Sequence, residues 1–296
     1  MPGAAGAGAA APGGAGTSGQ GGGGTAGKGP PANGTGGAGP TGGAGGAGHG
    51  GAGAGAAAGA GGGAGAGGGR PAPDVLILLD RSGSMNEMID GTTCTSGDCG
   101  AASKWSLVKT ALEGALPLYE ETLQWSLKVF ASATASSSCS VTAGVEIAPG
   151  FSNAAAIAAR LEALVAGSST PTTAAELAGA NYLSTVADGA PKYILLITDG
   201  IPTCGTAVCA PLGTGQITNQ CDDANAIAAV KAAHDTAGIP TMVVGVGTNL
   251  GTGVDTLEQM AVAGGLPRSS SPAYYPVQTT ADLMAAIQAL TAAAGL

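Results

Sequence analysis

The chain has 296 residues, of which 56 are glycine and only 3% are aromatic, and its formal net charge at pH 7 is −9. This acidic balance argues against non-specific binding of nucleic acid, although it says nothing about the fold. No stretch of about 18 apolar residues free of glycine and charge occurs, so we expect no transmembrane helix.

The composition divides the chain into two parts. Residues 1–70 contain 34 of the 56 glycines and no Leu, Ile, Val or aromatic residue. A segment with nothing to bury cannot offset the entropy of ordering its chain, so we expect a disordered Gly/Ala-rich tether. A packed array of polyglycine-type helices is the structural alternative. Residues 71–296 carry all 19 acidic residues and are numerous enough for one folded domain.

The second part alternates between strand and helix patterns. The aliphatic run of residues 74–79 is typical of a strand buried on both faces. Further strands are expected at 124–131, 141–147 (a weaker, antiparallel edge strand), 193–197, 241–246 and 274–277, and helices at 103–116, 153–165, 172–183, 222–237, 254–263 and 280–293. This alternation predicts an α/β fold, a Rossmann-like doubly wound and mostly parallel six-stranded sheet with helices on both faces.

A polar motif follows the first strand directly. Asp80, Ser82 and Ser84 place one carboxylate and two hydroxyls at alternate positions. The strand delivers them to the carboxyl edge of the sheet, where open α/β sheets bind ligands. Three hard oxygens suit a hard divalent cation such as Mg²⁺. A helix N-cap is the alternative interpretation.

Two later segments complete a pattern. A second aliphatic strand ends in Thr198-Asp199-Gly200, and the loop of residues 169–173 lies between the two strands. Together these motifs resemble a von Willebrand factor type A domain of the bacterial secreted or surface type, with its metal-ion-dependent adhesion site D-x-S-x-S. The resemblance implies a strand order of 3-2-1-4-5-6. It also implies these metal ligands: Asp80, Ser82, Ser84, Thr170 and Asp199. Thr172 is the alternative threonine, although its position also suits helix capping.

The resemblance further implies a function. The metal would be Mg²⁺, with Mn²⁺ or Ca²⁺ as alternatives. A protein ligand that presents an acidic side chain would complete its coordination with a carboxylate. We expect an adhesion or protein-binding module rather than an enzyme, and the oligomeric state is not predicted. The alternative is a structural or assembly module whose metal only stabilises the fold.

The enzyme interpretations fit less well. A serine hydrolase lacks the G-x-S-x-G setting, and a phosphatase with Asp80 as nucleophile would need a carboxylate where Ser82 stands. The folded part has a single histidine, His234, within an expected helix. A calcium site at Asp222 and Asp223 is a further alternative.

The six cysteines bear on the compartment. They are Cys94, Cys99, Cys139, Cys204, Cys209 and Cys221. Two pairs have the spacing C-x4-C, whereas zinc sites usually use C-x2-C, so we expect disulfides, pairing 94–99, 204–209 and 139–221. Disulfides predict an extracytoplasmic location, secreted, periplasmic or on the cell surface, although no signal peptide is visible. Reduced thiols in a cytoplasmic protein are the alternative.

Overall fold

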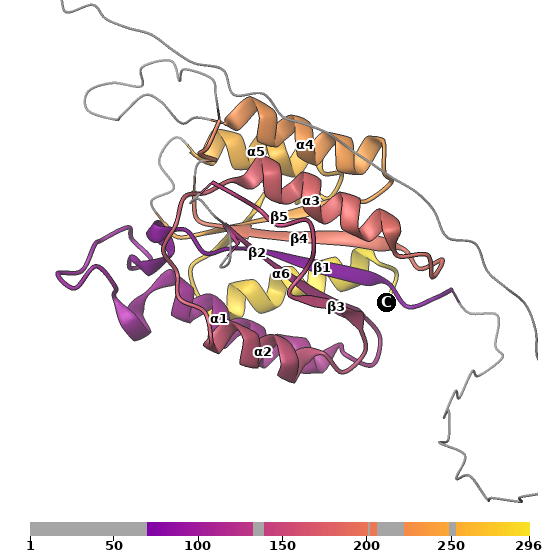
Figure 1. The fold of residues 1–296 in the computed structure, drawn as a ribbon, viewed down its shortest axis with the longest axis horizontal. Helices are drawn as coiled ribbons and strands as arrows, with labels where there is room; N and C mark the ends of the chain where they lie inside the picture. Colours follow the sequence, from indigo (N-terminus) through magenta and orange to yellow (C-terminus); the bar gives the residue numbers. More distant parts are fainter. Residues whose placement is uncertain (1–69, 133–138, 201, 206–221, 249–252) are drawn as a thin grey trace, which may run out of the picture. The chain divides into compact units, whose positions relative to one another are not determined.

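The computed structural model describes residues 70–132, 139–200, 202–205, 222–248 and 253–296 (Figure 1). Residues 1–69 of the expected tether, and both Cys209 and Cys221, lie outside these ranges. The strands are β1 (Asp74–Asp80), β2 (Gln124–Phe130), β3 (Ile147–Gly150), β4 (Lys192–Thr198), β5 (Thr241–Val246) and β6 (Tyr275–Val277). The α-helices are α1 (Lys104–Ala115), α2 (Ala154–Glu162), α3 (Thr172–Thr185), α4 (Asp223–Asp235), α5 (Gly253–Ala263) and α6 (Thr280–Ala293). Short 3₁₀ helices are η1 (Gly83–Asn86), η2 (Gly100–Ala102) and η3 (Leu116–Leu118).

The strands form one sheet in the order β3-β2-β1-β4-β5-β6. β1 lies in its middle and pairs in parallel with both β2 and β4. Within the described residues only β3 runs antiparallel to its neighbour. The predicted doubly wound α/β fold is therefore confirmed, and the strand order is the one that the resemblance implies.

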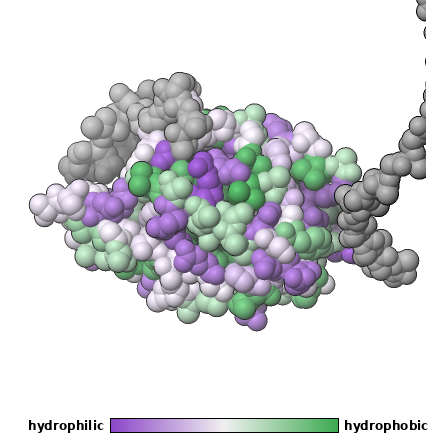
Figure 2. All heavy atoms as spheres, turned by 60° about the horizontal axis from the view of Figure 1, so that its bottom comes forward, coloured by the Kyte–Doolittle hydropathy of each residue, from purple (hydrophilic) through white to green (hydrophobic). Residues whose placement is uncertain are grey.

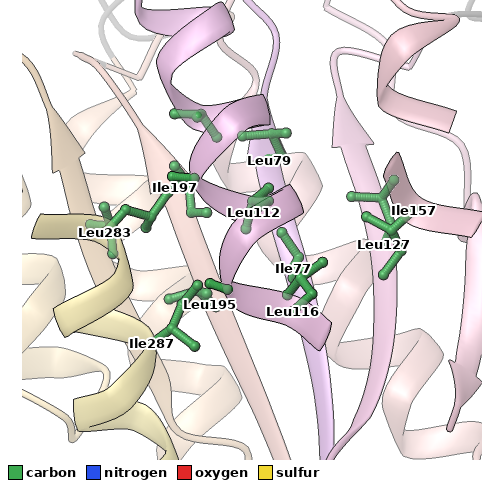
Figure 3. Close-up of a cluster of buried hydrophobic side chains, with 14 of the residues drawn as sticks. Ile77, Leu79, Leu112, Leu116, Leu127, Ile157, Leu195, Ile197, Leu283 and Ile287 are labelled. Carbon is green, nitrogen blue, oxygen red and sulfur yellow. The ribbon is translucent and has the colours of Figure 1, made fainter. Parts of the chain in front are cut away.

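Alternating side chains of β1 enter two separate hydrophobic clusters. Ile77 and Leu79 pack with residues of α1, α2 and α6, whereas Leu76 and Leu78 pack with residues of α3, α4 and α5. Figure 1 shows these two helix layers on opposite sides of the sheet, and Figure 3 shows the first cluster closely. All five aliphatic residues of β1 are 0% exposed, which explains why the strand reads as an unbroken apolar run.

The outer surface of the α1, α2 and α6 layer is mixed in polarity. Figure 2 turns this side toward the reader and shows hydrophobic residues interspersed with hydrophilic ones. This is the pattern of helices that pack one face against the sheet and turn the other to solvent. No helix in the described part of the chain is long and apolar enough to cross a membrane.

The edge strand was predicted at the wrong place. The expected strand at residues 141–147 begins only at Ile147. The reason is that side chains take the place of ladder hydrogen bonds: the buried Lys128 donates from Nζ to Thr142 O (2.5 Å) and Gly144 O (2.6 Å). The Glu146 carboxylate accepts from Val129 N at 2.9 Å. A sequence pattern does not show this substitution of side chains for backbone partners.

A buried carboxyl group lies between α3 and the sheet. Glu176 is 0% exposed, and its Oε1 accepts a hydrogen bond from Thr241 Oγ1 at 2.6 Å. Its Oε2 has no partner among the described residues. Burial raises the pKa of Glu176 to about 7, and the Thr241 bond opposes this only in part.

We predict that the stability of the domain depends on pH through Glu176. Because the folded pKa lies above the unfolded one, the unfolded state loses its proton first as pH rises, and stability falls between about pH 4.5 and 7. Glu176→Gln should remove this pH dependence. Between pH 4 and 8, the free energy of unfolding of wild type should therefore fall by about 3 kcal/mol relative to that of the variant. Urea unfolding at both pH values measures it.

The matched control is Glu113→Gln, because Glu113 is exposed on α1. Its difference from wild type should not change with pH. An equally constant difference for Glu176→Gln would contradict the prediction.

Candidate metal centre

The two motif strands end side by side at the carboxyl edge of the sheet. Asp80 is the last residue of β1, and Asp199 directly follows β4. The parallel register pairs Leu79 with Ile197, so Asp80 lies level with Thr198 and Asp199 follows one residue further along. The connections on either side of β1 run in opposite directions here, which is where open α/β sheets form their sites.

Asp80 is fully buried and held from two sides. Its Oδ1 accepts from Ser82 N at 2.7 Å, and its Oδ2 accepts from Thr198 Oγ1 at 2.6 Å. Burial, and secondarily the charge of Asp199, raise the pKa of Asp80 to about 7. A cation close to both carboxylates would favour their charged forms.

The hydroxyls of the motif connect to Asp199 by hydrogen bonds. Ser82 Oγ and Ser84 Oγ lie 3.0 Å apart, and Ser84 Oγ donates to Asp199 Oδ1 at 2.8 Å. Ser82 occupies the N-cap position of η1 but makes no side-chain capping bond. The N-cap interpretation is therefore wrong for the side chain of Ser82, which bonds to Ser84 instead.

The loop that carries Thr170 is fastened to the same edge. Gly83 N donates to Ser168 O at 2.9 Å. Thr170 exchanges hydrogen bonds with Thr203 in both directions, from Thr170 N to Thr203 Oγ1 at 2.8 Å and from Thr203 N to Thr170 O at 2.9 Å. Thr170 itself is 7% exposed. Its hydroxyl as a ligand stays a prediction.

Thr172, the alternative threonine, is the first residue of α3 rather than its cap. Its hydroxyl is buried and has no hydrogen-bond partner among the described residues. The capping role considered for Thr172 is wrong, and its role as the alternative ligand stays a prediction.

Sequence reasoning missed Lys104, the first residue of α1. Its ammonium lies 2.8 Å from Asp199 Oδ2 and 3.3 Å from Glu87 Oε2, and its side chain is 3% exposed. A signal was present: a cation in the first turn of a helix opposes the helix dipole and needs a carboxylate nearby.

Arg81 connects the motif to two neighbouring segments of backbone. Its Nε donates to Ala131 O at 2.7 Å and its Nη1 to Val165 O at 2.6 Å. Its backbone also pairs with Phe130 O and Gly167 N. These bonds fix the end of β2 and the segment before α3 around the motif.

The described residues contain two disulfides, of which one was predicted and one was not. Cys94 and Cys99 are bonded as expected. Cys204 pairs with Cys139, with a Cα–Cα distance of 5.5 Å, so the expected pairs 204–209 and 139–221 are wrong. The topology explains this, because Cys139 and Cys204 follow the parallel strands β2 and β4, which flank β1 and end at the same edge.

The donor chemistry fits a hard divalent cation. Asp80, Ser82, Ser84 and Asp199 offer only oxygens, which suits Mg²⁺, Mn²⁺ or Ca²⁺ better than zinc. No cluster of three or more His, Cys, Asp or Glu side chains that could hold a metal occurs in the described ranges. The candidate centre has two carboxylates, and its remaining donors are hydroxyls.

The alternative calcium site at the start of α4 has ordinary helix-terminal contacts. Asp222 Oδ1 accepts from Asn225 at 2.6 Å, and Asp223 Oδ1 accepts from Thr256 Oγ1 at 3.0 Å. Both carboxylates therefore have partners that do not require an ion.

Comparison with solved structures supports the fold. The chain is similar to the pilus adhesin SpaC from Lactobacillus rhamnosus GG, with a TM-score of 0.53 and 16% identity over 76% of this chain and 30% of that one. It is also similar to the PilB minor pilin from Streptococcus sanguinis, with a TM-score of 0.51 and 15% identity over 76% of this chain and 61% of that one.

These neighbours share an architecture with this chain. At such low identity the likeness establishes the fold alone, and the chain spans 30% and 61% of the lengths of the two proteins. No protein-family description and no curated protein matches the sequence.

We predict that Arg81→Met destabilises the domain by about 2 to 4 kcal/mol, because two hydrogen bonds from a buried guanidinium are lost together. Urea unfolding of both proteins measures the difference. Arg160→Met, on the partly exposed face of α2, is the matched control and should change stability by less than about 0.5 kcal/mol. Equal effects of the two substitutions would contradict the anchoring role.

Proposed function

We propose that the domain is a protein-binding module that uses a divalent cation, Mg²⁺ in the first place. The cation would be held by the candidate centre, which comprises Asp80, Ser82, Ser84, Thr170 and Asp199. An acidic side chain of a protein partner would supply the last ligand. The observation that carries the proposal is the hydrogen-bonded row Ser82, Ser84 and Asp199 beside the buried Asp80.

The charges of the centre favour a ligand that carries negative charge. The two serines and the threonine add oxygens without adding charge, so two carboxylates at most neutralise a divalent ion. Lys104 already pairs with Asp199, which reduces the negative charge available to the ion. A bound cation would therefore remain electron-poor and attract a carboxylate from a partner.

The described residues of the motif differ in their exposure to solvent. Asp80, Ser82 and Asp199 are buried, whereas Ser84 is partly exposed and Gly83 is exposed. A partner would reach the ion past Gly83 and Ser84.

A metal that only stabilises the fold is the rival function. Both carboxylates of the centre already have protein partners: Asp80 has Ser82 N and Thr198, and Asp199 has Ser84 and Lys104. A fold whose buried acids are paired in this way does not need a metal to form. These paired acids favour partner binding over stabilisation of the fold as the role of the ion.

A hydrolase is not supported by the surroundings of the serines. Ser82 and Ser84 bond to each other, and Ser84 also bonds to Asp199. Nucleophilic catalysis would need a base such as histidine beside the hydroxyl. In the described ranges the histidine is His234 on α4, whose Nδ1 lies 2.9 Å from Asp235.

Display outside the cytoplasm is part of the proposal. The disulfides Cys94–Cys99 and Cys139–Cys204 support it, because such bonds persist in oxidising compartments. The likeness in fold to a pilus adhesin and a minor pilin agrees with an adhesion or assembly role.

The test measures metal binding and partner capture on the same proteins. Millimolar Mg²⁺ should raise the melting temperature of wild type by a few degrees, since a ligand that binds only the folded state stabilises it. Asp80→Ala should lose this shift. Immobilised wild type should capture a protein from cell-surface fractions in Mg²⁺ and release it in EDTA, and Asp80→Ala should capture none.

Asp188→Asn is the control, because Asp188 is an exposed acid near the start of β4, at the opposite edge of the sheet. It should behave as wild type in both assays. The proposal fails if Mg²⁺ shifts all three proteins equally, or if capture does not depend on the metal.

A further inference from the structure

Lys104 is buried against the candidate centre, and its ammonium group has an acceptor for each of its three donors. Its Nζ lies 2.8 Å from Asp199 Oδ2, 3.3 Å from Glu87 Oε2 and 3.4 Å from Ser84 O. An ammonium group has three donors and no acceptor, so these three oxygens account for all of them. Two of the three oxygens belong to the centre's own residues.

The position of Lys104 is electrostatically unfavourable without these partners. It begins α1, where the helix dipole repels cations, and its side chain is 3% exposed. Burying an ammonium group is strongly unfavourable unless the group is paired. Asp199 is the closest partner, and its side chain is 0% exposed, so each charge depends on the other.

A divalent ion in the centre and the ammonium group of Lys104 would both lie beside the carboxylate of Asp199. Ser84 occupies Asp199 Oδ1 and Lys104 occupies Oδ2. An ion that approaches Oδ1 beside the two serines therefore feels a fixed positive charge on the far side of the same group. Repulsion between charges a few ångströms apart is substantial even at an effective dielectric constant of about 20.

We propose that Lys104 is an internal cation that competes with the divalent ion for the charge of Asp199, and so lowers and sets the metal affinity of the centre. This inference rests on the proposed function. Glu87 completes the arrangement, because it lies within reach of the same ammonium and is 29% exposed on its side chain. Lys104 therefore keeps a counter-ion when a metal takes Asp199.

The test replaces the charge and measures binding of the metal alone. Lys104→Met and Lys104→Gln are titrated with MgCl₂ and MnCl₂ by calorimetry, and melting temperatures are recorded with and without metal. Both variants should bind the ions about tenfold or more tightly than wild type. Both should melt lower without metal, because Asp199 loses its positively charged partner, and should show a larger metal-induced shift in melting temperature. Lys104→Gln retains a donor toward Asp199, so it provides a folded protein if Lys104→Met does not.

Lys109→Met is the matched control. Lys109 lies on the same helix and pairs with the largely exposed Glu162 at 2.7 Å, so its removal deletes the same charge away from the centre. Its metal affinity should stay within about twofold of wild type, because exposed charges are strongly screened.

The outcomes separate this inference from the proposed function. Tighter binding by both Lys104 variants supports it, including the case in which wild type binds no metal and the variants do. Equal or weaker binding by the variants, with binding by wild type intact, overturns it and leaves Lys104 as a group that only positions Asp199. Absence of binding by every protein overturns both proposals.

Discussion

The structure must accommodate two buried carboxylates close together at the ends of adjacent central strands. Asp80 is 0% and Asp199 is 4% exposed, and the charge of Asp199 contributes to a raised pKa of Asp80. Such proximity is unfavourable unless donors or cations neutralise it. The surrounding polar contacts, from Thr198 to Lys104, follow from this constraint. A divalent ion at this rim, as we propose, would neutralise the same charges.

The fold brings the two carboxylates together and also holds the segments around them in place. β1 is apolar on both faces because helices cover both, so its only polar residue near the carboxyl end projects at the rim. Arg81 and the loop of Thr170 fasten the neighbouring segments to this rim through backbone carbonyls. The Cys139–Cys204 bond joins the loops that follow the two strands beside β1. These contacts join the separate segments from which the oxygens come.

Much of this arrangement was predictable from local patterns, and the rest depends on contacts between distant segments. The aliphatic runs ending at Asp80 and Asp199 predict two central parallel strands, and the D-x-S-x-S spacing predicts that its oxygens face one rim. The edge strand was misplaced because Lys128 and Glu146 replace ladder bonds with side-chain bonds. The pairing of Cys204 with Cys139 follows from strand order, which cysteine spacing does not encode. Lys104 was missed because its partner Asp199 lies 95 residues away in the sequence.

The proposed centre requires side chains from separate segments to meet around one divalent ion. Diffraction from crystals grown with MnCl₂, recorded at the manganese absorption edge, tests this claim directly. We expect a single strong anomalous peak within about 2.5 Å of both Ser82 Oγ and Ser84 Oγ and facing Asp80 and Asp199. A fully folded protein with no peak at this rim, or with manganese bound elsewhere, would contradict it.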